Sequence, residues 1–167
     1  YVRILKSALA NKKFPKLKRA RYELQLKQLE HSMTGEAPNI FEFTRSNGES
    51  ARYFPMSTPT IIIFGDPECG DCRMAKLRMQ ANVAFSKAVS DGKINVLFII
   101  PDPEDGWEKM AEDFPANWTV GASDSVSDIY DIRDIPEVYV IGSDGKIAAK
   151  HITTMQAMNR SMSLINE

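Results

Sequence analysis

Two apolar runs with an amphipathic segment between them dominate the hydrophobic pattern of the chain. Thr60 to Phe64 is a continuous run of β-branched and aromatic residues, and Ile94 to Ile100 is a second apolar run. Such runs are typical of strands buried on both faces. Between them, Arg73 to Ser90 predicts one helix, whose apolar face would contain Met74, Leu77, Ala81, Ala84, Phe85 and Ala88. This order predicts a parallel βαβ unit with a right-handed crossover.

Shorter patterns surround this unit. Residues 1–32 predict helix interrupted at Phe14-Pro15, and residues 40–44 and 51–54 predict a hairpin around Ser46-Asn47-Gly48-Glu49. Residues 103–114 and 123–132 predict short helices separated by a loop over 115–121. A second hairpin, 137–141 with 146–150, is predicted around Ser143-Asp144-Gly145. A last helix runs from Thr153 to the end, with one face formed by Met155, Met158, Met162 and Ile165.

This order of elements predicts an α/β protein, a sandwich with a central mixed β-sheet and helices on both faces. We expect residues 34–167 to form this domain and residues 1–33 to form a helical N-terminal segment, which we interpret as the tail of a truncated upstream domain. The segment is strongly basic but contains Glu23 and Glu30. A solvated helical face explains this charge pattern better than a membrane-surface helix does, although both interpretations remain open.

Charge and hydropathy exclude two classes of protein. The net charge of the 167 residues is −1, whereas a nucleic-acid binder needs a basic face. No apolar run approaches the ~20 residues that a membrane-spanning helix requires.

Both cysteines of the chain, Cys69 and Cys72, lie between the first buried strand and the following helix. A disulfide that closes so short a loop contributes only about 2 kcal/mol to stability, so a structural disulfide is a poor explanation for the cysteine pair. A structural zinc site needs four Cys or His ligands, and the two histidines, His31 and His151, are far away in sequence. A redox pair is the interpretation that we favour, and no metal is expected.

Three motifs in order resemble the TlpA/ResA type of thioredoxin-like thiol-disulfide oxidoreductase. The first is Gly35-Glu36-Ala37-Pro38, followed by a strand and an Asn-Gly turn. The second is Cys69-Gly70-Asp71-Cys72 after the buried strand, and the third is the segment from Tyr130 through Pro136 to Gly145. The basic helical segment is similar to that of Bacteroides-type multi-domain members.

The resemblance implies a thioredoxin-like fold and a role for each motif residue. Cys69 would be the attacking thiol at the helix N-terminus, and Cys72 the more buried resolving thiol. Pro136 would follow a cis peptide bond, leaving the Ile135 backbone exposed for pairing with an extended substrate. The residues Glu68, Gly70 and Asp71 would shape the site.

The same resemblance implies how the protein would work in the cell. The substrates would be protein thiols and disulfides outside the cytoplasm, in the periplasm or cell envelope, and an upstream reductant would supply electrons. A membrane anchor ahead of Tyr1 is compatible with that location. The redox-active Cys69–Cys72 disulfide would need no further cofactor.

Several positions depart from the family pattern. Glu68 stands where Trp is usual, and Asp71 stands where Pro is frequent. The two places where the family carries a proton acceptor for the second cysteine are occupied by Ile63 and Ala75. Nearby carboxylates disfavour the Cys69 thiolate, so we expect a reducing couple. The alternative function is a redox-inert binding or structural module with the same fold.

Overall fold

The computed structural model describes residues 2–166, so the parts of the predicted terminal helices at Tyr1 and Glu167 lie outside it. The chain forms one seven-stranded sheet with the strand order β2-β1-β5-β4-β3-β6-β7. The strands are β1 (Phe41–Arg45), β2 (Ser50–Tyr53), β3 (Thr60–Phe64), β4 (Asn95–Ile100), β5 (Thr119–Ala122), β6 (Glu137–Ile141) and β7 (Ile147–Lys150). Strands β3, β4 and β5 are parallel, whereas β6, β7, β1 and β2 run antiparallel to their neighbours.

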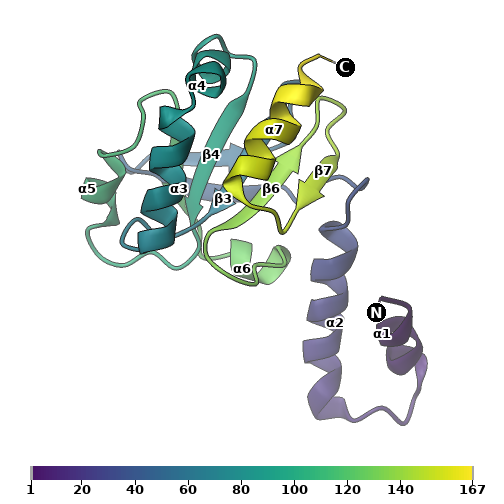
Figure 1. The fold of residues 1–167 in the computed structure, drawn as a ribbon. Helices are drawn as coiled ribbons and strands as arrows, with labels where there is room; N and C mark the ends of the chain where they lie inside the picture. The colour runs from purple at the N-terminus through teal and green to yellow at the C-terminus, as the bar shows by residue number, and fades with distance from the viewer. Residues whose placement is uncertain (1, 167) are drawn as a thin grey trace.

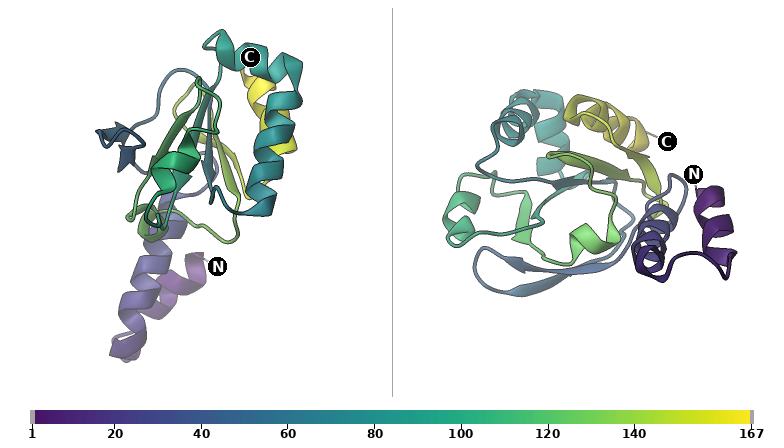
Figure 2. Two further views of the ribbon diagram at one scale, coloured as in Figure 1. Left: turned by 90° about the vertical axis from the view of Figure 1, so that its left-hand side faces the viewer. Right: turned by 90° about the horizontal axis from the view of Figure 1, so that it is seen from below.

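Helices lie on both sides of this mixed sheet, as the sequence predicts (Figures 1 and 2). The helices are α1 (Val2–Ala10), α2 (Lys16–His31), α3 (Gly70–Ala81), α4 (Val83–Ser90), α5 (Trp107–Ala111), α6 (Val126–Ile129) and α7 (Thr154–Leu164). Helices α3, α4 and α7 cover one face, where they pack on residues such as Ile61, Ile63 and Phe98. Helix α6 covers an aromatic layer on the other face, which includes Phe64, Tyr130 and Tyr139.

The predicted helix over residues 73–90 is in fact two helices. Asn82 has extended backbone angles of φ −78° and ψ 99°, and its side chain accepts a hydrogen bond from the backbone N–H of Phe85. Asn82 therefore ends α3 and caps α4. The break rotates the apolar face, so Met74 and Leu77, expected in the core, are 47% and 53% exposed. Met155 at the start of α7 is likewise exposed, contrary to the prediction.

Strand β5 lies partly in the segment predicted as the loop 115–121. Only Thr44 and Arg45 of β1 pair with it, opposite Ala122 and Gly121. A Cβ atom on Gly121 would lie 2.4 Å from the Phe43 ring, so only glycine lets β1 approach β5 this closely. Strand β5 therefore joins the β1–β2 hairpin to β4, and the hydrophobic pattern alone does not predict this pairing.

Helices α1 and α2 form an arm that extends away from the sheet on the side of α6 (Figure 1). Leu5 is buried between the two helices, and the Arg19 guanidinium donates hydrogen bonds to the carbonyl oxygens of Leu9 and Asn11 at the end of α1. The Gln28 side chain joins α2 to α6 through the Ser127 carbonyl oxygen. Leu17 is 97% exposed, which fits a largely solvated arm.

Candidate functional site

The register of the sheet brings the predicted site residues together. Strand β6 is antiparallel to β3, and Glu137 lies opposite Phe64. The loop that follows β3 and the loop that precedes β6 therefore lie at the same end of the sheet. Cys69 Sγ is 3.9 Å from the carbonyl oxygen of Ile135, and the Ile135–Pro136 peptide bond is cis.

Backbone hydrogen bonds define the turn that carries the first cysteine. The Gly65 N–H donates to the Ile99 carbonyl oxygen on β4, at 3.0 Å. The Asp66 side chain accepts from the Glu68 N–H at 2.7 Å, and the Asp66 carbonyl oxygen accepts from the Cys69 N–H. Cys69 then occupies the N-cap position of α3. Its thiol thus lies near the unpaired N–H groups of the first helical turn, which stabilise negative charge.

The two thiols have different environments. Cys69 is partly exposed, whereas Cys72 is 2% exposed and belongs to the core beneath α3. Burial raises the pKa of Cys72 to about 12, and a backbone hydrogen bond from Asp66 offsets only part of that rise. Both cysteines are free thiols. The arrangement pairs an accessible sulfur with one that is held protonated at neutral pH.

Gly65 is required by the packing around the buried thiol. A Cβ atom at this position would lie 2.7 Å from the Phe98 ring and 3.1 Å from Cys72 Sγ. Gly70, which lies between the cysteines, has no such restriction, because nothing lies within 4 Å of a Cβ atom there. The sequence motif predicts Gly70 as a site residue but does not reveal the role of Gly65.

The remaining predicted residues surround this pair. Glu68 and Asp71 are exposed, and Asp71 lies in the first turn of α3. Ile63 and Ala75 are buried in apolar surroundings, so neither family position offers Cys72 a proton acceptor. Ile135 is 39% exposed, and its carbonyl oxygen lies beside Cys69 Sγ.

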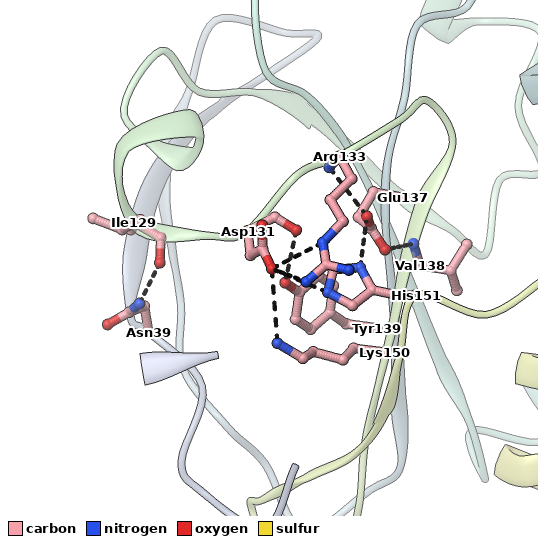
Figure 3. Close-up of polar contacts among 9 residues, drawn as sticks. All are labelled: Asn39, Ile129, Asp131, Arg133, Glu137, Val138, Tyr139, Lys150 and His151. Carbon is pink, nitrogen blue, oxygen red and sulfur yellow. Dashed lines mark hydrogen bonds and ion pairs between the residues drawn. The ribbon is translucent and has the colours of Figure 1, made fainter. Parts of the chain in front are cut away.

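Sequence reasoning missed a polar cluster around Glu137, the residue that follows Pro136 in the chain (Figure 3). Glu137 is only 4% exposed. One of its carboxylate oxygens lies 2.9 Å from His151 Nδ1 and accepts the Arg133 N–H, and the other accepts the Val138 N–H. His151 Nε2 lies 3.2 Å from Asp131 Oδ2. A carboxylate at the start of an otherwise apolar strand was the available signal, because such residues are rarely buried without partners.

Cations hold Asp131 in its ionised form. Burial, the largest single influence, would raise the pKa of Asp131, but a 2.8 Å hydrogen bond from the Arg133 guanidinium and the charges of Arg133, His151 and Lys150 together lower that pKa. Lys150 Nζ lies 4.0 Å from the same carboxylate oxygen, and burial lowers the pKa of this lysine. The cluster is therefore a network of charges and not a set of isolated groups.

A cleft of about 470 Å³ opens beside the cysteine pair, between α3, the loop before β6 and the start of α7. Its lining combines apolar and charged side chains, including Met74, Ile152, Arg78, Asp71, Pro136 and His151. Within residues 2–166, no group of three or more His, Cys, Asp or Glu side chains is arranged to hold a metal ion. The side chain of His31 lies outside the described part of the structure.

Comparisons with known proteins identify the class of fold. No protein-family model and no curated protein matches the chain. A thioredoxin-like protein from Bacteroides caccae is 21% identical with a TM-score of 0.79, and the match covers 98% of this chain and 61% of that one. A conserved protein of unknown function from Bacteroides fragilis is 26% identical with a TM-score of 0.72, over 77% and 98% of the two chains.

A third solved structure carries a functional name. The thioredoxin domain of a thiol-disulfide oxidoreductase from Bacteroides vulgatus is 20% identical with a TM-score of 0.67, over 80% of this chain and 99% of that domain. The chain therefore has a thioredoxin-like fold, and the predicted fold class is confirmed. In the described part of the chain, no helix is both long enough and apolar enough to cross a membrane.

Proposed function

We propose that the protein is a thiol-disulfide oxidoreductase that uses Cys69 and Cys72 to reduce or exchange protein disulfides. The observation that carries the proposal is the placement of a partly exposed thiol at the N-terminus of α3, 3.9 Å from the Ile135 carbonyl oxygen, with a buried thiol one helical turn further on. The names of the structural neighbours support the same general chemistry.

The reaction has two exchange steps. The Cys69 thiolate attacks one sulfur of a substrate disulfide, so that a Cys69–substrate bond forms and the other substrate sulfur leaves as a thiolate. The Cys72 thiolate then attacks Cys69 Sγ, which forms the Cys69–Cys72 disulfide and releases the second substrate thiolate. The substrate gains two electrons, and an upstream dithiol reductant restores the protein by the reverse exchange. No further cofactor takes part in these steps.

The second step is the one that the structure makes difficult. Cys72 must lose a proton, and its pKa is raised to about 12 by burial. No carboxylate stands at position 63 or 75 to accept that proton. We infer that hydroxide or the departing substrate thiolate accepts it, so resolution of the mixed disulfide limits turnover near neutral pH.

The exposed surface around Cys69 suits an extended peptide. Ile135 presents its backbone next to the attacking sulfur, and Met74 adds an exposed apolar side chain at the cleft. In the family that the sequence resembles, the residue before the cis proline pairs with the substrate backbone. We assign Ile135 this role, with Pro136 beside it and Glu68, Gly70 and Asp71 shaping the approach to the sulfur.

We also propose residues 34–167 as the redox domain, residues 1–33 as a helical arm, and a location outside the cytoplasm. The resemblance of the three sequence motifs to TlpA/ResA-type oxidoreductases supports this setting.

A redox-inert binding module is the second candidate. The pKa of Cys72 is raised, and the apolar Ile63 and Ala75 cannot accept its proton, so Cys72 is poorly suited to resolve the mixed disulfide quickly. Insulin reduction by the wild type, Cys69→Ser and Cys72→Ser separates the two. An oxidoreductase loses turnover on Cys69→Ser, and Cys72→Ser stops at the mixed disulfide. Equal, absent turnover in the wild type and Cys69→Ser would favour the module.

A further inference from the structure

The charged cluster beside the Ile135–Pro136 loop has no part in the exchange steps described above. His151 lies at its centre, with Nδ1 2.9 Å from Glu137 Oε2 and Nε2 3.2 Å from Asp131 Oδ2 (Figure 3). Asp131 precedes Ile135 in the chain and Glu137 directly follows Pro136. One imidazole ring therefore contacts both ends of the loop that presents the Ile135 carbonyl oxygen to Cys69.

Hydrogen-bonding chemistry fixes the protonation state of this ring. A neutral imidazole has one donor and one acceptor, whereas an ionised carboxylate only accepts. Asp131 is held ionised by the Arg133 guanidinium, and Glu137 already accepts the N–H groups of Arg133 and Val138. Only an imidazolium at His151 can donate a hydrogen bond to both carboxylates. Such charge-assisted hydrogen bonds are about twice as strong as neutral ones.

The backbone of His151 shows that its position is enforced. Its φ angle is +53°, in the left-handed region that residues other than glycine, asparagine and aspartate rarely adopt. Such a conformation is strained and persists only where surrounding contacts compensate. Here the compensating contacts are the two carboxylates, together with the Tyr139 ring, whose centroid lies 6.0 Å from that of the imidazole.

We propose that His151 is a positioning residue whose imidazolium ties Asp131 to Glu137 and thereby keeps the Ile135 backbone in place beside Cys69 Sγ. The expected effect on peptide binding rests on the proposed oxidoreductase function, whereas the expected effect on the loop does not. Loss of one ring proton breaks one of the two bonds and leaves two facing carboxylates, so the loop loosens. Peptide substrates that pair with Ile135 then bind more weakly, while the thiol chemistry of Cys69 continues.

Charged and titratable groups on four elements surround or face this ring. The loop before β6 contributes Asp131 and Arg133, and β6 contributes Glu137 and Tyr139. Strand β7 contributes Lys150, α3 contributes Asp71 and Arg78 on the same cleft, and the exposed Asp134 lies on the cleft rim. Among the described residues 2–166, Asp131 and Glu137 alone contact the ring nitrogens, so variants that remove these hydrogen bonds test the proposal directly.

The kinetic test compares the wild type with His151→Asn in the full chain. Asparagine tolerates the left-handed backbone, so the substitution removes the bridge with little added strain. For reduction of a peptide disulfide, we expect KM to rise about tenfold and kcat to change little. The free energy of one charged hydrogen bond corresponds to about a tenfold change in a binding constant. The alkylation rate of Cys69 by iodoacetamide should stay within about twofold. Lys146→Gln, an exposed cation at the far end of the same hairpin, is the matched control and should change neither value.

The split between KM and kcat is a readout that a purely structural role would not produce. Asp131→Asn, which removes the other bonded group, provides a second variant if His151→Asn fails to fold, and its KM should also increase.

Amide hydrogen exchange tests the loop without reference to activity. In His151→Asn, the N–H groups of Arg133 and Val138 should exchange faster, while the amides shared by β3 and β4 keep their protection. If loop exchange is faster in His151→Asn and the wild type turns over no disulfide, the positioning role is upheld and the oxidoreductase proposal is overturned. An active wild type whose KM and loop exchange are both unchanged in His151→Asn would overturn the positioning role.

Discussion

The two loops that meet at Cys69 are held in place by different forces. The loop from Gly65 to Glu68 is fixed by backbone hydrogen bonds and by the packing of Gly65 against Phe98 and Cys72. The loop before β6 is fixed by charged side chains, with His151 between Asp131 and Glu137. The cysteine side should therefore respond to changes in volume, and the proline side to changes in charge and pH.

This difference also separates two tasks of a disulfide-exchanging site. The packed loop sets the environment of the thiols, because burial controls how readily Cys72 ionises. The charged loop sets the position of the Ile135 backbone, where a substrate would bind. Chemistry and recognition can then be altered separately.

The largest expected effect concerns the rate at which Cys72 resolves a mixed disulfide. With its pKa raised to about 12 by burial, the thiolate fraction of Cys72 rises tenfold for each pH unit in the neutral range. Resolution should accelerate about a hundredfold from about pH 7 to about pH 9. Release of 5-thio-2-nitrobenzoate from its mixed disulfide with Cys69 measures this rate, with Cys72→Ser as the blank. A rate independent of pH would show that Cys72 is already ionised.

Local patterns account for what the sequence predicted well. Strand β3 and the start of α3 could be predicted because a buried β-branched run and a Cys-x-x-Cys turn are contiguous in the chain. The break at Asn82 was not predicted, because an asparagine within an amphipathic pattern does not reveal whether it caps a helix. The charged cluster was missed because it depends on the β6–β7 register, in which Tyr139 pairs with Lys150 and brings His151 back to Glu137.

The packed loop should be sensitive to a single methyl group. Gly65→Ala places a Cβ atom 2.7 Å from the Phe98 ring and 3.1 Å from Cys72 Sγ, so we expect a loss of about 1–3 kcal/mol in the free energy of unfolding. Gly70→Ala is the matched control, since its Cβ meets nothing within 4 Å and alanine favours helix. Urea denaturation of both variants measures the difference. Equal stabilities would mean that the packing around Cys72 is loose.

The charged loop should respond to acid instead. Because the pKa of Asp131 is lowered in the folded protein, its ionised form contributes stability above the pKa of an unfolded aspartate, and that contribution is lost as the pH falls through the folded value. Asp131→Asn should lower the free energy of unfolding by about 1 kcal/mol at neutral pH, with the difference disappearing in acid. Thermal unfolding across pH 7 to 3, roughly the range in which aspartates titrate, measures it. A difference that persists in acid would assign Asp131 a steric role.

The smallest expected effect lies where the two loops face each other. Asp71 is exposed in the first turn of α3 and also lines the cleft bounded by the charged loop. Its charge opposes the Cys69 thiolate, and removing that charge stabilises the reduced form. Asp71→Asn should therefore raise the reduction potential by about 10–20 mV, because exposed charges contribute well under 1 kcal/mol. Glutathione redox titration measures the shift, with the wild type expected to be reducing. A wild-type potential near about −120 mV, typical of a strong oxidant, would contradict the proposed effect of the acidic side chains around Cys69.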